Sequence, residues 1–416
     1  MLGALDSREP VWDNAARATG PAMMQATVVS SPRSTALQMR ASVLRQPGRA
    51  PGVETVWLDP PGSGEVLVRV VAAGVCHSDL HLADGRLGAG RWPMVLGHEG
   101  AGVVEAVGEG VSGVHVGDHV VFCLVASCGS CEPCRSGHRT LCEPAGAQSI
   151  AGNLPSGGRR LHGADGEALQ HGLGIACFAE RAVVCAGSLI PIPHDIPLWQ
   201  AALLGCGVVT GFGAVTHAAR VRIGERVAVV GCGGVGLQVI AAARLAGAGT
   251  IVAIDRSAEK LAHALRRGAT HAVAVSAGDT AAEVIALTGG GVDHAFEVVG
   301  AAETIRLAWD ALRPGGTAVV VGLAPRGVDV ALPAIEFLSQ KSIVGSYYGT
   351  ADPVYALPGL VELVRSGRLE LADVVSHLIE LDGVADAMDR LRRGEGDRSV
   401  IIIDPELAGA TAGGTT

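Results

Sequence analysis

The chain has 416 residues, of which 48% are hydrophobic and 18% charged, and its formal net charge is −9. That length favours two domains over a single hydrophobic core, and the acidic balance argues against a nucleic-acid or membrane-surface partner. No apolar signal-peptide core follows the charged start MLGALDSREP, so we expect a cytoplasmic protein whose cysteines form no disulfide framework.

The first part of the sequence predicts an extension followed by a β-rich domain. Residues 1–38 mix Pro, Gly, Ser and Thr with scattered charges and show no sustained hydrophobic period, so we expect a disordered extension. From residue 39 to about residue 122, short apolar runs such as EVLVRVVAAGV and DHVVFCLV alternate with Gly and Pro turns. This pattern indicates an antiparallel β-barrel.

The second part has a different pattern. Residues 196–219 lack charged side chains over a length that suits a membrane span, but their many glycines favour a packed loop and helix. From about residue 224 to residue 345, strand-like runs such as RVAVVG and TIVAID alternate with helical patterns, which predicts βαβ units on a parallel sheet. The pattern from PGLVELVRSGRLE to SVIIID indicates a helix and a strand that can rejoin the first domain, and residues 405–416 predict a flexible tail.

A glycine-rich stretch, VVGCGGVG, follows the first of these strands and opens a helical pattern. Gly231, Gly233 and Gly236 form the pattern G-x-G-x-x-G, which permits a tight turn and a close approach of the backbone to a pyrophosphate. The next strand ends on Asp255, a residue suited to accept hydrogen bonds from ribose hydroxyls and to repel a 2′-phosphate. The sequence therefore predicts a dinucleotide site that prefers NAD to NADP.

Four cysteines lie within the short stretch CGSCEPCRSGHRTLC, namely Cys128, Cys131, Cys134 and Cys142. Four thiolates at this spacing can surround one tetrahedral zinc and leave no position open, which makes the ion structural. An iron–sulfur cluster is the alternative, since the C-x2-C-x2-C opening also occurs in ferredoxins.

Two further cysteines and a histidine can form a second metal site. Cys76 lies in GVCHSDLH, His98 in VLGHEGAG and Cys206 in LLGCGVVTG. Two thiolates and one imidazole leave the fourth position of a tetrahedral zinc open, as catalysis requires.

These motifs occur in one order, and the stretch from Met39 to Asp404 resembles the zinc-dependent medium-chain alcohol dehydrogenases. The resemblance implies an α/β chain in which a GroES-like catalytic domain, residues 39–205 and 346–404, is interrupted by a doubly wound parallel-sheet Rossmann domain, residues 206–345. It also implies two zinc ions per chain, one catalytic and one structural, and NAD as the cofactor.

The resemblance further implies roles for single residues. Glu99 is expected beside the catalytic zinc, Ser78 and His81 are expected to pass the alcohol proton to solvent, and Asp79 is expected to orient His98. Contacts with the dinucleotide are implied for His77, Thr210, Gly231, Gly233, Gly234, Val235, Gly236, Asp255, Lys260 and Arg398.

The expected substrate is a primary alcohol, aliphatic or benzylic, which is oxidised reversibly to its aldehyde. Leu124 and Val125 fall where the family lines its pocket, and aromatic residues make up only 3% of the chain. S-hydroxymethylglutathione is an alternative, but beyond Asp84 the acids expected after the CHSD segment are missing, as is the arginine expected after Cys142. The chain also resembles a branch that holds NAD so tightly that an external acceptor reoxidises it. A long interval between Cys142 and Cys206 favours a homodimer.

Two other classes of protein share parts of this pattern. A zinc-ribbon module that binds nucleic acid or protein would need only the four-cysteine loop, and the acidic balance argues against it. The zinc-free quinone reductases lack the ligands Cys76, His98 and Cys206. We expect the number of zinc ions per chain to separate the three classes.

Overall fold

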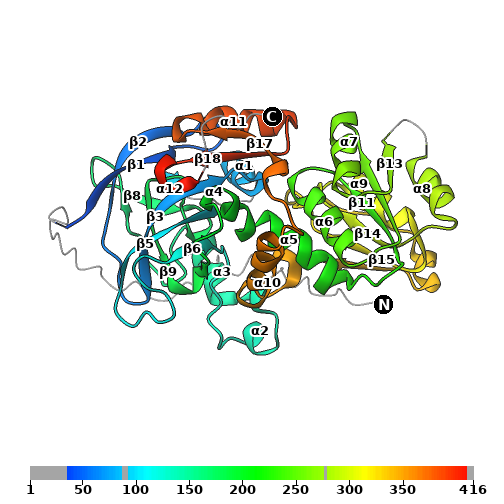
Figure 1. Ribbon diagram of the computed structural model, residues 1–416, viewed down its shortest axis with the longest axis horizontal. Helices are drawn as coiled ribbons and strands as arrows, with labels where there is room; N and C mark the ends of the chain where they lie inside the picture. Colours follow the sequence, from blue (N-terminus) through cyan, green and yellow to red (C-terminus); the bar gives the residue numbers. More distant parts are fainter. Residues whose placement is uncertain (1–34, 87–91, 276–278, 410–416) are drawn as a thin grey trace, which may run out of the picture.

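The computed structural model describes residues 35–86, 92–275 and 279–409, which form two lobes lying side by side (Figure 1). The lobe at the left of Figure 1 is rich in β-structure, and the lobe at the right holds a parallel sheet covered by helices. Both parts predicted from the sequence patterns, the β-rich domain and the βαβ domain, are therefore present.

The β-rich lobe combines a closed barrel with a seven-stranded sheet. The barrel contains β1 (Leu37–Leu44), β2 (Gly52–Leu58), β7 (Leu161–His162), β8 (Ala168–His171) and β4 (Met94–Val95). The sheet runs in the order β10 (Leu189–Ile192), β6 (His119–Phe122), β5 (Glu99–Val107), β3 (Glu65–Gly74), β18 (Arg398–Ile402) and β17 (Val375–Ile379), and β9 (Arg181–Cys185) also pairs with β3. Most pairs are antiparallel as predicted, but β4 with β8 and β17 with β18 are parallel.

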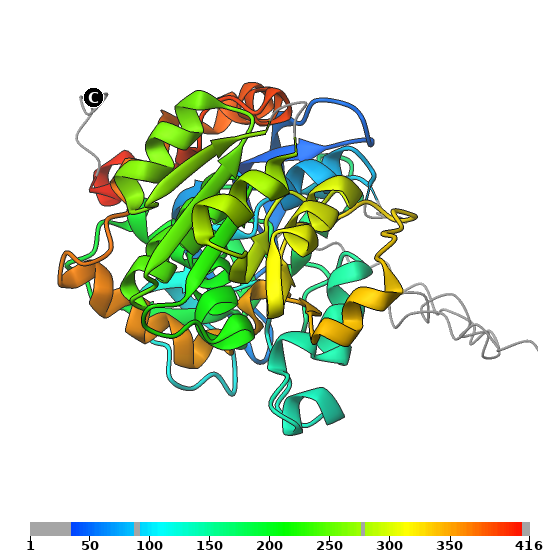
Figure 2. The same ribbon diagram turned by 90° about the vertical axis from the view of Figure 1, so that its right-hand side faces the viewer.

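The other lobe has a six-stranded sheet with only parallel neighbours. Its order is β13 (His271–Ala274), β12 (Thr250–Asp255), β11 (Arg226–Val230), β14 (Val292–Glu297), β15 (Leu312–Val320) and β16 (Ser342–Gly345). The side chains of β11 alternate between two hydrophobic clusters. Val227 and Val229 belong to one cluster, and Ala228 and Val230 belong to the other. Both faces of the sheet are thus covered by helices, which explains the continuous apolar runs (Figure 2).

The helices of this lobe divide between the two faces. Leu237 of α6 (Gly234–Leu245) and Leu261 of α7 (Ala258–Arg267) belong to the first cluster. Val284 of α8 (Thr280–Thr288) and Trp309 of α9 (Ala302–Asp310) belong to the second. This is the doubly wound arrangement predicted from the sequence, with ligand sites at the carboxyl ends of the strands.

The C-terminal segment returns to the first lobe. After α10 (Pro353–Arg365) and α11 (Val384–Arg393), β18 pairs antiparallel with β3, so the predicted return is confirmed. The predicted tail from residue 405 needs a correction, because Pro405–Ala408 form helix α12, capped by Asp404, and Ala408 is fully buried. Residues 410–416 lie outside the described part, as do residues 1–34 of the predicted extension, while residues 37 and 38 already belong to β1.

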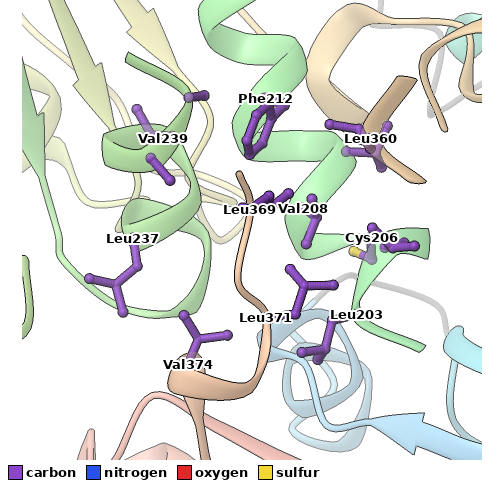
Figure 3. Packing of buried hydrophobic residues seen from close by; sticks show 14 of the residues in the cluster. Leu203, Cys206, Val208, Phe212, Leu237, Val239, Leu360, Leu369, Leu371 and Val374 are labelled. Carbon is purple, nitrogen blue, oxygen red and sulfur yellow. The ribbon is translucent and has the colours of Figure 1, made fainter. Parts of the chain in front are cut away.

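The uncharged stretch near residue 200 forms a bent pair of helical segments, Leu198–Gly205 and Gly207–Ala219, at an angle of 48°. Taken together, the two segments are long and apolar enough to cross a membrane, whereas no single helix among the described residues is. Leu203, Val208 and Phe212 of the pair are buried in the hydrophobic core between the lobes (Figure 3).

Candidate active site

The three predicted zinc ligands meet at the junction of the lobes. Cys76 directly precedes α1 (His77–Ala83), His98 directly precedes β5, and Cys206 directly precedes α5 (Gly207–Gly213). Their ligand atoms lie within 4.8 Å of one another, and all three residues are buried. Residues that are far apart in the sequence are thus held at a spacing that one metal ion can bridge.

His98 is oriented by a buried carboxylate. Its Nδ1 lies 3.1 Å from Oδ1 of Asp79, and the same carboxylate accepts hydrogen bonds from the amides of Gly97 at 3.0 Å and Cys76 at 3.3 Å. The Nε2 atom is buried and has no hydrogen-bond partner in the described part of the chain. A metal ion would satisfy this nitrogen, and a carboxylate on the far side of the ring is the usual support of a metal-binding imidazole.

The charges around the cluster favour a thiolate. The hydrogen bond with Cys206 and the nearby cations Arg398 and His98 hold the pKa of Cys76 well below its usual value, although burial opposes this. Burial lowers the pKa of His98, but the Asp79 carboxylate outweighs it and raises the pKa above its usual value. A thiolate is the form that binds zinc, so this donor set fits the ion.

Glu99 lies next to the cluster but faces Arg398. The Nη1 atom of Arg398 is 3.0 Å from Oε2 of Glu99, and the amide of Gly207 donates to Oε1 at 3.2 Å. Glu99 is fully buried, and burial raises its pKa to about 7 although the charge of Arg398 opposes the rise. Arg398 also lies against the start of α6, since a Cβ at Gly234 would come within 2.5 Å of its Nε.

The glycine-rich turn has the geometry that its pattern predicts. Gly231 has a φ of 96°, and a Cβ at Gly236 would lie 1.9 Å from the carbonyl oxygen of Gly231, so both positions require glycine. The carboxylate of Asp255 accepts hydrogen bonds from the amides of Cys232 at 2.8 Å and Ser257 at 2.9 Å. Asp255 is thereby fixed beside the turn at the end of β12.

The other predicted dinucleotide contacts surround this turn. Thr210 lies on α5 and Val235 in the first turn of α6, and these helices pack so closely that a Cβ at Gly211 would meet Gln238 at 2.6 Å. His77 begins α1, and Lys260 lies in the first turn of α7. Burial lowers the pKa of His77, and the charges of Arg398 and Lys260 lower it further. These residues thus come from elements of both lobes, and Lys260 and Arg398 lie near enough to His77 to act on its charge.

Ser78 and His81 share helix α1, three residues apart. The Sγ of Cys76 lies 4.0 Å from the hydroxyl of Ser78, which puts this hydroxyl next to the thiolate cluster. Burial lowers the pKa of His81, so the imidazole is neutral near pH 7 and has a nitrogen able to accept a proton.

The four-cysteine loop forms a separate cluster. The Sγ atoms of Cys128, Cys131, Cys134 and Cys142 all lie within 4.8 Å of one another. Backbone amides point at the sulfur of Cys128, and the hydrogen bonds from Ser130 and Cys131 lower its pKa to about 6. Arg139 in this loop lies 3.3 Å from Asp352, the N-cap of α10, and so ties the loop to the rest of the lobe.

Sequence reasoning missed the contact between Glu99 and Arg398. It assigned Glu99 to the metal and Arg398 to the pyrophosphate, whereas the structure pairs the two side chains and makes Arg398 the link between both sites. A buried acid and a buried base in separate motifs gave no signal of their pairing, which depends on β18 lying beside β3.

Known proteins share this architecture. The family model described as "Alcohol dehydrogenase GroES-like domain" matches residues 62–194, and the one described as "Zinc-binding dehydrogenase" matches residues 234–366. S-(hydroxymethyl)glutathione dehydrogenase of Synechocystis sp. is 38% identical over 88% of this chain and 100% of its own length. NDMA-dependent alcohol dehydrogenase of Amycolatopsis methanolica is 39% identical over 88% of this chain and 99% of its own. The crystal structure of benzyl alcohol dehydrogenase from Acinetobacter calcoaceticus has a TM-score of 0.84, at 30% identity, covering 88% of this chain and 100% of that one.

Proposed function

Because this chain belongs to the zinc-dependent medium-chain alcohol dehydrogenases and is an NAD-linked oxidoreductase, we propose that it interconverts apolar primary alcohols and aldehydes. The observation that supports the chemistry most directly is the buried trio of Cys76, His98 and Cys206 beside the glycine-rich turn. An open metal position next to a dinucleotide cleft suits the oxidation of a hydroxyl carbon.

Cys76, His98 and Cys206 would hold the catalytic zinc, which, when bound, would supply a Lewis acid for the alcohol oxygen. The residues around it have separate tasks. Asp79 keeps the ring of His98 turned toward the ion, and Ser78 and His81 accept and pass on the hydroxyl proton along α1. Glu99 is held by Arg398, next to the metal position without being part of the trio.

The dinucleotide would lie over the glycine-rich turn, with its adenosine ribose at Asp255 and its pyrophosphate near Arg398. The carboxylate of Asp255 is fixed by two amides, and its charge repels a 2′-phosphate, which favours NAD over NADP. Thr210 and Val235 would back the nicotinamide ring, and His77 and Lys260 would add contacts at the phosphates and the ribose.

The four-cysteine loop would hold the structural zinc. Metal analysis of the purified protein tests both sites together, and we expect about two zinc ions per chain. One ion per chain would match a zinc-ribbon protein, and none would match a zinc-free reductase. Iron with a visible absorption band would instead identify an iron–sulfur cluster.

Aliphatic side chains near the thiolate cluster support the substrate class. Leu124 and Val125 follow β6 after Cys123; Val125 belongs to the hydrophobic cluster that contains Cys76 and Cys206, and Leu124 packs against it. Part of the argument against S-hydroxymethylglutathione rests on the segment after the CHSD motif, of which residues 87–91 lie outside the described part. The other part rests on the stretch after Cys142, which the structure describes and which reads EPAGAQ, without the expected arginine.

A substrate screen tests this proposal. The relative values of kcat/KM for ethanol, hexanol, benzyl alcohol and S-hydroxymethylglutathione would be measured with NAD, and separately with an added electron acceptor. We expect hexanol and benzyl alcohol to exceed ethanol and the glutathione adduct, with moderate ratios because a pocket methylene contributes only about 1–3 kcal/mol. A strong preference for the glutathione adduct would reject the apolar pocket. Turnover only with the acceptor would identify tightly held NAD.

A homodimer in the cytoplasm completes the proposal. Strand β16 lies at the edge of the parallel sheet, and next to it η8 (Ala334–Ser339) exposes Ile335 and Leu338. An edge strand with apolar neighbours is suited to pairing with another copy of the chain. Light scattering during size-exclusion chromatography would measure the mass of the assembly.

Six of the ten cysteines lie in the two groups that could hold a metal ion, a use that needs reduced thiols and so suits a reducing compartment.

A further inference from the structure

A half-buried cluster of charges joins helix α7 to the C-terminal segment. The Nδ1 atom of His263 on α7 lies 2.6 Å from Oδ2 of Asp397, and its Nε2 lies 3.9 Å from Oδ2 of Asp373. Arg267, one turn farther along the same helix, donates from Nη1 to both carboxylate oxygens of Asp373 at 2.8 and 2.9 Å. Arg267 also reaches Gln238 of α6 at 3.3 Å.

The segment that carries Asp373 is fixed on both sides. Leu369, Leu371 and Val374 are buried, and they lie between Leu237 of α6 and Val208 of α5 (Figure 3). The chain then continues into β17 beside β18. Asp373 itself is exposed, but buried neighbours on both sides, Leu371 and Val374, anchor the turn that carries it.

The cluster connects the two ends of the proposed dinucleotide site. Helix α7 starts at Ala258, three residues after Asp255, and carries Lys260 in its first turn, one turn before His263. Asp397 immediately precedes Arg398, which lies against the start of α6. A contact between His263 and Asp397 thus fixes the distance between the helix at the adenosine end and the strand at the pyrophosphate end.

Charge adds to this geometry. The carboxylates of Asp373 and Asp397 raise the pKa of His263 to about 9, so the imidazole is a cation at neutral pH. The other charged groups around it are Lys260 and Arg267 on its own helix, while Glu395 on the turn before β18 is paired with Arg393. Without the His263 cation, the carboxylate of Asp397 would lie uncompensated next to the binding position of two phosphates.

We propose that His263 is a positioning residue for NAD, whose contacts with Asp397 and Asp373 hold α7 against the strand that carries Arg398 and so slow the release of the dinucleotide. This inference rests on the proposed function, because it takes the glycine-rich turn as the NAD site. It would also supply a structural reason for tight retention of NAD, the alternative to free exchange that the sequence left open.

A double-mutant cycle tests the contact. The variants are His263→Gln, Asp397→Asn and the pair, with Arg266→Gln, an exposed neighbour on α7, as the control. NADH dissociation would be followed by stopped-flow fluorescence and NAD affinity by calorimetry. We expect each single variant to raise the dissociation rate at least about fivefold, the pair to raise it no further than the larger single effect, and the control to leave it unchanged.

The pH profile separates positioning from general structural support. In the parent protein the dissociation rate should rise as the pH passes about 9, where His263 loses its proton, and this step should be missing in His263→Gln. Unchanged dissociation in both single variants, or a lowered melting temperature as the sole effect, would overturn the inference. Failure of the parent protein to bind NAD would reject the proposed function instead.

Discussion

Arg398 and Glu99 form a buried ion pair, 3.0 Å apart, that lies between the thiolate cluster and the first turn of α6. Arg398 is 7% exposed and Glu99 is fully buried. Taking both charges out of water is costly, and the pair is stable only because each compensates the other. Removal of either side chain leaves the charge of the other buried without its partner of opposite sign.

Glu99→Gln is therefore expected to lower the free energy of unfolding by about 3 kcal/mol, because it leaves the Arg398 cation buried without its carboxylate. Denaturation in urea would measure the change. Glu105→Gln is the matched control, since Glu105 pairs with Arg181 at 2.7 Å in a more exposed position and should cost at most about 1 kcal/mol. Equal losses in the two variants would contradict the importance of the buried pair.

Cys128→Ser should remove one ligand of the proposed structural zinc and leave the thiolate trio intact. We expect the loss of about one zinc ion per chain and a fall in Tm of at least about 5 °C, because metal binding contributes directly to folding. Metal analysis and calorimetry give the two readouts. Cys185→Ser, at a half-buried cysteine outside both clusters, should retain both ions. Retention of both ions by Cys128→Ser would reject the structural site.

Asp255→Gly should relax the exclusion of NADP. The carboxylate that repels the 2′-phosphate is removed, so the ratio of kcat/KM for NADP to that for NAD should rise at least about tenfold, or about 1.4 kcal/mol. Steady-state kinetics with both cofactors measures the ratio. Glu259→Gln, an exposed acid nearby on α7, should leave it unchanged. A similar ratio in all three proteins would place the adenosine elsewhere.

His171 predicts a loss of stability in mild acid. Burial, and then the charges of Arg159 and Arg160, lower its pKa to about 3, and its Nε2 accepts a hydrogen bond from the amide of Arg160. The unfolded chain binds this proton near pH 6.5, so the contribution of neutral His171 is complete above that pH and declines as the pH falls toward 3.

His171→Gln should remove this dependence. Between pH 7 and pH 5 the parent protein should lose about 2 kcal/mol more of unfolding free energy than the variant does. Urea denaturation at both pH values measures the difference. Parallel losses in the two proteins would show that His171 is protonated in the folded state.

The sequence predicted those parts of the structure that depend on local spacing. The glycines around Gly233, the thiols from Cys128 to Cys142 and the acid at the end of β12 lie in short motifs whose geometry follows from the backbone. The fold class followed from the change between alternating and continuous apolar runs. Each of these features is determined within about thirty residues, in keeping with the size of one βαβ unit.

Long-range contacts were not predictable in the same way. The pairing of Arg398 with Glu99 and that of His263 with Asp397 depend on how β18 returns to β3, and no local pattern specifies that register. Helix α12 was missed for a related reason. Its residues are small and polar enough to indicate a tail, and they form a helix because Ala408 packs into the core.

The antiparallel pairing of β18 with β3 has a consequence for synthesis on the ribosome. The parallel sheet, from β11 to β16, is complete before the last strands emerge, so that lobe can fold while translation continues. The seven-stranded sheet has to wait for β18 until residue 402 has left the exit tunnel, and until then the Ala72–Gly74 end of β3, beyond the residues that pair with β9, lacks its partner strand. During that interval nascent chains expose the apolar end of β3 to one another, and this is the stage at which a chaperone would protect them from aggregation.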